Sequence, residues 1–167
     1  MKIVFEGDHV YVLERDHWQY VERKKGKEAA AVLAETEDGE IVLTEQFRRP
    51  VNARVIDFPA GLIGDEDPSV DGAETARREL EEETGYACDS VELLARGPSS
   101  PGITSEIVSL YRAHGVRKIG KGGGVGDEDI TVHVVSRARL RSFLLEKNAQ
   151  GVLTDLKVAL CFLMQSS

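Results

Sequence analysis

One stretch of ten residues constrains the fold of this chain more than any other, because it predicts a helix of unusual charge. The stretch RRELEEETGY, residues 77–86, carries four glutamates and two arginines, and its glycine is well placed to cap a helix. Like charges three or four residues apart destabilise a helix by roughly a few tenths of a kcal/mol. We expect a helix over residues 73–84, capped by Gly85, whose crowded charge is favoured by something outside the helix.

The spacing of the charges indicates which faces this helix presents. Each residue of an α-helix advances about 100° around the axis, so Glu79, Glu82 and Glu83 share one face. Ala76 and Leu80 fall on another face, which can pack on a sheet. Clustered carboxylates are ligands for a hard divalent cation such as Mg²⁺ or Mn²⁺, and a bound dication turns their repulsion into attraction. A solvated acidic face has the same spacing, so spacing alone leaves both interpretations open.

The rest of the chain alternates between short strand patterns and turn signals, which predicts a mixed sheet. A small antiparallel sheet is expected over residues 2–23, and a hairpin over 28–47 around Asp38-Gly39. We further expect strands at residues 53–59, 90–97, 107–116 and 130–135, a flexible glycine-rich loop at 120–129, and helices at 136–147 and 152–165. Strands before and after a central helix, with helices at the end, predict an α/β fold in which two helical layers flank a mixed sheet.

Composition limits the class of protein. With 167 residues, of which 41% are hydrophobic and 30% charged, the chain has the size and composition of one globular domain. Its net charge of −8 argues against nucleic acid as a partner, because phosphate-backbone binding needs clustered lysine and arginine. Cys88 and Cys161 form no CxxC motif and suit a reducing compartment. No apolar run approaches the roughly 18 residues that span a bilayer. We therefore expect a cytoplasmic protein without a membrane partner.

A wider stretch, GLIGDEDPSVDGAETARRELEEETGY at residues 61–86, resembles the Nudix box, whose pattern is G-x5-E-x7-R-E-U-x-E-E-x-G-U with U a bulky apolar residue. The second half matches residue for residue, at Arg78, Glu79, Leu80, Glu82, Glu83, Gly85 and Tyr86. The first half departs from the pattern, because three additional residues separate Gly61 from Arg78 and the place of the first glutamate falls on Val70. We expect an inserted loop in which Glu66 replaces that glutamate, with Asp71 and Asp65 as alternatives.

The resemblance to the Nudix superfamily implies a fold, a reaction and a metal site. The Nudix fold is an α/β/α sandwich, and its members hydrolyse a nucleoside diphosphate linked to another group. The resemblance carries direct metal ligation over to Glu79 and Glu83, a ligand or bridging role to Glu82, and ligation by the carbonyl to Ala60. It implies Mg²⁺ as cofactor, with Mn²⁺ also able to serve. Arg78, one turn before Glu82, can pair with it and hold it in position, so both count among the expected catalytic residues.

Further segments resemble the ADP-ribose pyrophosphatase and nucleoside-diphosphate-sugar hydrolase branch of the superfamily. They are WQYVER with GKEAAAVLA, then EQFRRPV, FPAG, and SSPGITSE, whose proline lies fifteen residues beyond the end of the box. The resemblance implies substrate contacts by Trp18, Arg48, Arg49, Pro101, Gly102, Thr104 and Glu106. Arginine suits this role because it can hold phosphate oxygens at two points. Simpler interpretations stay open: solvated arginines at a strand end, a tryptophan anchoring a small core, and ordinary loop residues.

Related enzymes of this branch often exchange their N-terminal strands across a homodimer, where aromatic residues stack on the base of the substrate. We accordingly expect N-terminal strands at residues 1–24, available for such an exchange, and a Nudix hydrolase domain at 25–167. The expected assembly is a homodimer.

The segment GVGDEDITVHVV at residues 124–135 resembles the part of the branch that carries catalytic acids. Aligned on EDI, Glu128 takes the place of a metal-binding glutamate with a catalytic role, and Gly126 stands where an acid often assigned as general base is expected. This departure leaves three candidates for the base: Asp127, Glu128 and Glu82. The five glycines between residues 120 and 126 can form a mobile lid that brings Glu128 to the metals, or a plain surface connector.

Together these features predict a metal-dependent pyrophosphohydrolase. Its expected substrate is ADP-ribose or a related nucleoside diphosphate sugar, cleaved to a nucleoside monophosphate and a sugar phosphate. Other nucleoside diphosphate derivatives, such as GDP-mannose, NADH or coenzyme A, form the first alternative. A ligand sensor that keeps the fold without turnover forms the second. The intact RELEEETG stretch argues against the sensor, whereas Gly126 and the enlarged box loop argue mildly for it.

Overall fold

The computed structural model describes residues 1–65, 67–126 and 128–163, with the backbone alone at 162 and 163. Its strands and helices, in chain order, are β1 (Lys2–Glu6), β2 (Val10–Arg15), β3 (Trp18–Arg23), β4 (Glu28–Glu35), β5 (Glu40–Arg48), β6 (Ala53–Asp57), β7 (Ala60–Ile63), α1 (Gly72–Thr84), β8 (Tyr86–Ala87), β9 (Ser90–Pro98), β10 (Ile107–His114), β11 (Arg117–Lys118), β12 (Ile130–Ser136), α2 (Leu140–Ala149), β13 (Leu153–Thr154) and α3 (Leu156–Leu163). Two 3-10 turns, Arg49–Val51 and Arg137–Arg139, precede β6 and α2. Within the described residues, no helix has both the length and the apolar character that crossing a membrane requires.

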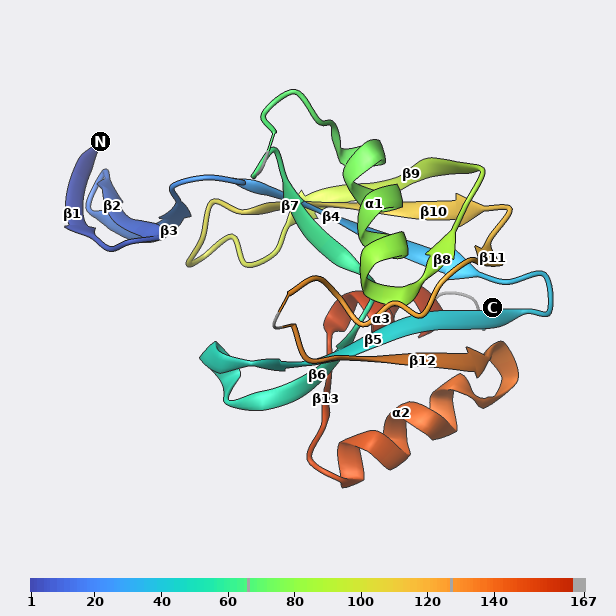
Figure 1. Ribbon diagram of the computed structural model, residues 1–167. Coiled ribbons are helices and arrows are strands. Elements are labelled where there is room, and N and C mark those ends of the chain that lie inside the picture. The colour runs from blue at the N-terminus through green and yellow to red at the C-terminus, as the bar shows by residue number, and fades with distance from the viewer. Residues whose placement is uncertain (66, 127, 164–167) are drawn as a thin grey trace.

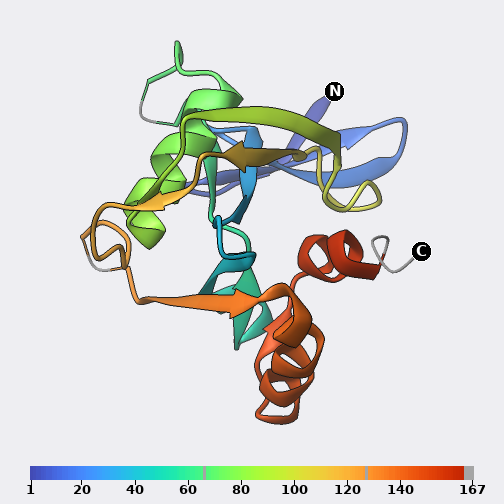
Figure 2. The same ribbon diagram turned by 90° about the vertical axis from the view of Figure 1, so that its right-hand side faces the viewer.

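Strand β4 lies at the centre of the fold and is buried on both faces. Because successive side chains of a strand point to opposite faces, Val32 packs in one core with Leu80 of α1. Leu33 packs in a second core with Leu140 of α2 and Val158 of α3. Figure 2 shows the resulting layers, with α1 on one side of the sheet and α2 and α3 on the other. The predicted α/β fold, a mixed sheet between two helical layers, is confirmed.

The main sheet opens along its middle, and this opening positions the site described below. Its strand order is β13-β6-β5-β4-β10-β9, with β12 added to β5 and β7 added to β4. Strands β4 and β5 form the predicted hairpin, but they pair only at Ala34 with Val42 and at Glu35 with Ile41. Beyond these pairs the two strands diverge, β7 continues along β4, and β12 runs along β5 (Figure 1). The space between β5 and β7 is thereby left to the side chains of α1 and of the loop before β12.

The N-terminal strands form a separate antiparallel sheet in the order β1-β2-β3, as predicted for residues 2–23. The turn between β2 and β3 is built from Asp16 and His17, both with positive φ. This sheet projects from the main body beside the loop that joins β9 to β10 (Figure 1). Two backbone hydrogen bonds attach it to that loop, from Val21 N to the Ile103 carbonyl at 2.8 Å and from Ser105 N to the Val21 carbonyl at 3.1 Å.

The two C-terminal helices begin later than the sequence pattern predicts. Helix α2 follows a 3-10 turn and extends to Ala149, so the predicted bounds 136–147 are wrong at both ends. The predicted helix at 152–165 is wrong at its start, because Leu153–Thr154 pair in parallel with β6 as the short strand β13. Helix α3 begins only after Asp155, whose carboxylate accepts the backbone N–H of Lys157 at 2.9 Å. Residues 164 and 165 lie outside the described chain.

Candidate active site

Helix α1 carries the candidate site, and its ends follow local sequence rules. Asp71 is the N-cap, and its carboxylate accepts the backbone N–H groups of Ala73 and Glu74 at 2.9 Å each. At the other end Gly85 has φ 69° and donates its N–H to the Glu81 carbonyl, as expected of a C-terminal cap. The helix therefore begins one residue before the predicted start and ends where predicted.

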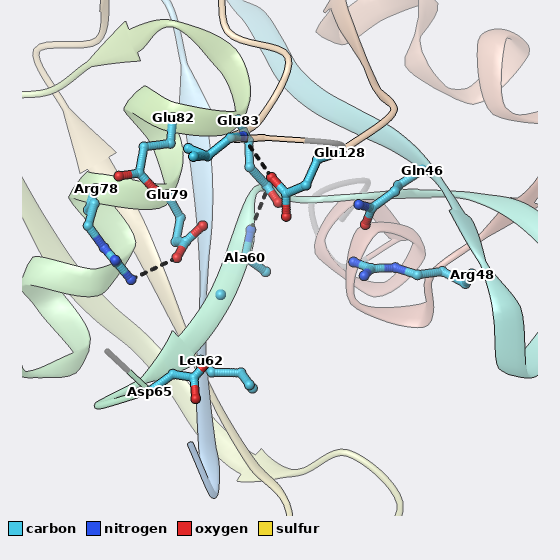
Figure 3. A pocket seen from close by; sticks show the side chains of 12 residues that line it. Gln46, Arg48, Ala60, Leu62, Asp65, Arg78, Glu79, Glu82, Glu83 and Glu128 are labelled. Atoms are coloured by element: carbon cyan, nitrogen blue, oxygen red, sulfur yellow. Dashed lines mark hydrogen bonds and ion pairs between the residues drawn. The ribbon is translucent and has the colours of Figure 1, made fainter. Parts of the chain in front are cut away.

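The acidic face of α1 borders a polar pocket of about 460 Å³. Described residues lining it are Gln46 and Arg48 of β5; Ala60, Gly61 and Leu62 of β7; Arg78, Glu79, Glu82 and Glu83 of α1; and Asp65, Val125 and Glu128 of two loops. Figure 3 shows Gln46 and Arg48 facing Glu83 and Glu128 across the pocket. The structure thus brings together the expected carboxylates and two expected arginines, Arg48 and Arg78, from segments far apart in the sequence.

Glu83 is the most buried of these carboxylates, with 6% of its surface exposed. One carboxylate oxygen accepts the N–H of Ala60 at 3.2 Å. The pKa of Glu83 is raised to about 8, mainly by burial; the Ala60 N–H and Arg48 oppose this shift, and the charges of Glu79 and Glu128 add to it. A buried carboxylate among other carboxylates is unfavourable by itself, and a cation held between them reverses the sign of that interaction.

Glu79 lies directly against the backbone of β7. A Cβ atom on Gly61 would lie 2.0 Å from the Glu79 carboxylate, so this close approach requires a glycine. Arg78 Nη2 donates to Glu79 Oε1 at 3.0 Å (Figure 3). We expected Arg78 to pair with Glu82; the structure instead directs it to the neighbouring Glu79, because adjacent long side chains on a helix can reach each other beside the strand.

Part of the glycine-rich segment before β12, within the flexible loop predicted for residues 120–129, is hydrogen-bonded to helix α1. Gly123 N donates to the Glu83 carbonyl at 2.8 Å, and Gly124 N donates to the Glu82 carbonyl at 3.1 Å. These bonds satisfy carbonyls at the C-terminal end of α1, where a helix leaves them without internal partners. The segment then turns so that Glu128 faces the pocket, and a carboxylate oxygen of Glu128 accepts the N–H of Val125 at 2.9 Å.

The position of the expected general base carries no side chain in this chain. Gly126 has φ 69°, and a Cβ placed on it would meet nothing within 4 Å. Asp127, one of the candidates for the base, lies outside the described residues. Glu82 and Glu128 both line the pocket, so the structure keeps these two candidates close to the expected metal site.

The pocket has the chemistry of a site for a hard divalent cation, although its carboxylates are held apart. Within the described part of the chain, no three His, Cys, Asp or Glu side chains are gathered closely enough to hold a metal ion as they stand. Separate donors hold three of the carboxylates: the side chain of Arg78 on Glu79, and backbone N–H groups on Glu83 and Glu128. Several carboxylate oxygens around one polar pocket fit Mg²⁺ or Mn²⁺. Ligation by these residues and by the Ala60 carbonyl stays a prediction.

The remaining predicted substrate residues form a second group beside the N-terminal sheet. Trp18 Nε1 donates to the Gly102 carbonyl at 3.3 Å, and Glu106 pairs with Arg23 at 3.0 Å. Thr104 forms an isolated bridge with Val21, and Pro101 directly precedes Gly102 in the chain. Trp18, Pro101, Gly102, Thr104 and Glu106 are absent from the described residues that line the acidic pocket. The structure therefore brings these five together, but apart from the carboxylates of the same chain.

Arg49 lies beside the acidic pocket and is not among the described residues that line it. It lines a neighbouring hollow with Phe47 and Asp129, and this hollow shares Gln46 and Glu128 with the acidic pocket. Of the two arginines expected to contact the substrate, Arg48 thus lines the pocket and Arg49 lies next to it.

The three candidates for the missing box glutamate have separate outcomes. Asp65 lines the pocket, Asp71 caps α1, and Glu66 lies outside the described residues.

Sequence reasoning missed Gln46 as a pocket residue. Side chains two residues apart on a strand share a face, so the choice of Arg48 could also have led to Gln46. It also missed Glu45, which is buried on β5 and bound by Arg54, His133 and Lys147.

The protein is thus an α/β protein with a mixed sheet between two helical layers, and the carboxylates of one acidic helix line a pocket where that sheet opens. In comparison with known families, residues 25–155 match the NUDIX domain. The chain belongs to the NUDIX family. The resemblance inferred from the box is confirmed by this match, and relatives named as ADP-ribose and GDP-mannose pyrophosphatases agree with the branch that the other segments resemble.

Among curated proteins, the chain is 44% identical over 108 residues to the methanol dehydrogenase activator of Bacillus methanolicus, covering 64% of this chain and 56% of that protein. It is 42% identical over 86 residues to the ADP-ribose pyrophosphatase of Bacillus subtilis, covering 51% and 44%. The chain thus spans about half the length of these two relatives. It is 32% identical over 163 residues to the GDP-mannose pyrophosphatase of Cronobacter sakazakii, covering 90% and 81%.

A solved structure of an ADP compounds hydrolase superposes with a TM-score of 0.67, covering 86% of this chain and 79% of that one. At 20% identity this likeness supports the shared fold.

Proposed function

We propose that the protein is a metal-dependent pyrophosphohydrolase of ADP-ribose or a related nucleoside diphosphate sugar, giving a nucleoside monophosphate and a sugar phosphate. The observation that carries the proposal is one pocket that is lined by Glu79, Glu82, Glu83 and Glu128 and has Arg48 on its opposite wall. A family match over residues 25–155 and relatives named as ADP-ribose and GDP-mannose pyrophosphatases support it.

In the proposed reaction, water attacks one phosphorus of the pyrophosphate, the bridging P–O bond breaks, and the water proton passes to a carboxylate. When bound, Mg²⁺ supplies Lewis-acid activation and neutralises phosphate charge. Arg48 is placed to contact phosphate oxygens from the opposite wall of the pocket. Glu82 and Glu128 are the proposed proton acceptors, and Arg78 keeps Glu79 in place through their 3.0 Å contact.

The direct test is to incubate the pure protein with ADP-ribose, ADP-glucose, GDP-mannose, NADH and coenzyme A, with and without Mg²⁺, and to separate the products by chromatography. We expect AMP and ribose 5-phosphate from ADP-ribose, and no product after chelation of the metal. Tight binding of ADP-ribose without turnover of any compound would replace the proposal by the non-catalytic sensor.

GDP-mannose is the second candidate substrate, because the GDP-mannose pyrophosphatase of Cronobacter sakazakii aligns over 90% of this chain. The same assay ranks the two. A kcat/KM for GDP-mannose well above that for ADP-ribose would assign the protein to this alternative, and the metal chemistry would stay as proposed.

We further propose a cytoplasmic homodimer in which the N-terminal sheet contributes to the partner's site. Trp18 and the loop around Gly102 lie apart from the pocket of their own chain, and the apolar side chains of Ile3 and Phe5 on β1 are exposed. A second subunit accounts for both features. Sedimentation should give about twice the chain mass of 18.4 kDa, whereas a single-chain mass would contradict the dimer. The two free cysteines suit the reducing cytoplasm.

A further inference from the structure

Arg54 of β6 connects two parts of the molecule that the proposed reaction does not use. Its Nε donates to Glu45 Oε1 at 2.6 Å, and its Nη1 donates to Asp129 Oδ2 at 2.7 Å. Its Nη2 lies 3.3 Å from the hydroxyl of Thr131 and 3.4 Å from the Asp129 carbonyl. One guanidinium therefore joins β5 to the residue that directly follows Glu128.

Glu45, which binds this guanidinium, is itself held in place by other side chains. Glu45 is 5% exposed, and its second carboxylate oxygen accepts from Lys147 at 2.8 Å and lies 2.9 Å from His133. Burial alone would raise the pKa of Glu45, but the hydrogen bonds from Lys147, His133 and Arg54 outweigh it and lower the pKa to about 2. Glu45 therefore stays charged at neutral pH and ties β5, β6, β12 and α2 together.

The segment carrying Glu128 is consequently fastened at both ends. Before Glu128, Gly123 and Gly124 bind the last carbonyls of α1 through their backbone N–H groups. A Cβ on Gly124 would lie 2.4 Å from the Glu128 carboxylate, so this carboxylate rests against the segment itself. After Glu128, Asp129 is bound by Arg54. The chain is therefore bound to α1 shortly before Glu128 and to β6 directly after it.

We propose that Arg54 and Asp129 are positioning residues that hold Glu128 against the acidic helix. Their effect on turnover rests on the proposed function, whereas their effect on the order of the segment does not. The side chain of Asp129 is 79% exposed, so its removal is expected to leave the core of the fold unchanged.

The first test measures order rather than activity. In ¹⁵N relaxation of the metal-free protein, we expect the order parameters of Val125 and Glu128 to fall from about 0.85 toward 0.6 in Asp129→Ala. Asp89→Ala is the matched control, because Asp89 forms an exposed pair with Arg117 away from the pocket. It should leave both order parameters unchanged. Equal order parameters in the wild type and Asp129→Ala would overturn the positioning role.

The second test asks whether the two residues act through Glu128. In Asp129→Ala we expect kcat to fall about 10- to 100-fold with little change in KM, as for other residues that orient a site residue, and Asp129→Asn should restore part of the loss. In a Glu128→Gln background, Asp129→Ala should cost nothing further. Additive losses would overturn the proposal. An inactive wild type would instead refute the proposed function, and the relaxation result would still decide the positioning.

Discussion

Two glutamates of this protein are almost equally buried, and their surroundings are opposite. Glu45 on β5 is bound by Arg54, Lys147 and His133, and its pKa is lowered to about 2 despite burial. Glu83 on α1 has one backbone N–H from Ala60 and further carboxylates nearby, and burial raises its pKa to about 8. Glu45 is therefore held as an anion within the chain, whereas Glu83 has few such partners and, with a pKa of about 8, is mostly protonated at neutral pH without metal.

The difference separates a structural carboxylate from a functional one. Burying a charge costs free energy unless partners replace water, and the chain supplies those partners to Glu45. Among the described residues, the hydrogen-bond partner of the Glu83 carboxylate is the single backbone N–H of Ala60, so the metal-free fold carries a carboxyl group in its pocket that is unfavourable to ionise. Such a cost is expected at a site that binds an external cation, where stability is given up for function.

The largest predicted effect is on turnover. Glu82→Gln should lower kcat by about 10²- to 10⁴-fold, because it removes a charged pocket ligand and a candidate proton acceptor. The metal-free variant should be as stable as the wild type or slightly more so, since like charge on α1 is relieved. Chromatographic rate assays and urea unfolding check both parts.

Glu74→Gln is the control for this change. Glu74 is exposed on the same helix and lies outside the motif, so its replacement should leave kcat nearly unchanged. Full activity in Glu82→Gln would remove Glu82 from the mechanism.

The next largest effect is on stability. Glu45→Gln should lower the free energy of unfolding by about 2–3 kcal/mol, because it leaves Arg54 and Lys147 without their anion. Both cations stay partly exposed, which keeps the loss below that for a fully buried pair. Urea unfolding measures it. In the matched control Glu35→Gln, the exposed pair with Arg137 should cost below about 1 kcal/mol. Equal losses in the two variants would contradict the structural role of Glu45.

The pH dependence of this loss gives a smaller and more specific signal. The pKa of Glu45 is lowered in the folded protein from 4.5 to about 2, so its contribution is present above pH 4.5 and disappears as the pH falls through about 2. The stability difference between the wild type and Glu45→Gln should therefore be constant above about pH 5 and shrink below it. A difference that stays constant down to pH 2 would mean that packing, and not charge, causes the loss.

The smallest predicted effect is the stability change in Glu83→Gln. The amide can still accept the Ala60 N–H and is neutral, as the Glu83 carboxyl group with its pKa of about 8 mostly is at neutral pH, so the free energy of unfolding should stay unchanged or rise by up to about 1 kcal/mol without metal. Turnover should fall sharply in the same variant. Thermal unfolding in the presence of a chelator measures the first part, and a loss as large as that in Glu45→Gln would erase the contrast between the two glutamates.

Local patterns predicted those parts of the molecule that depend on neighbours in the chain. Helix α1, its Gly85 cap and the hairpin of β4 and β5 follow from spacing and turn residues within short windows. The strand β13 escaped prediction because two residues carry no period, and only pairing with β6 makes them a strand.

The partners of the buried carboxylates come from distant parts of the chain and could not be predicted from local patterns. Glu45 is bound by residues 54, 133 and 147, and no local motif joins them. The separation of Trp18 from the acidic pocket of the same chain also has no local signal in the sequence, and only the resemblance, with its exchange of N-terminal strands across a homodimer, is consistent with it. The partner of Arg78 was mistaken because helix spacing places Glu82 nearby, while the position of β7 against Glu79 emerges only in three dimensions.

The hydrogen bonds from Gly123 and Gly124 to the end of α1 also determine when the pocket can be completed while the chain is being synthesised. The acidic helix leaves the ribosome well before residues 123–136, which supply those bonds, Glu128 and strand β12. A nascent chain that stops short of this segment can form the helix and the central strand, yet its pocket lacks a wall. Assembly of the site is therefore a late step of folding that waits for contacts between segments distant in the chain.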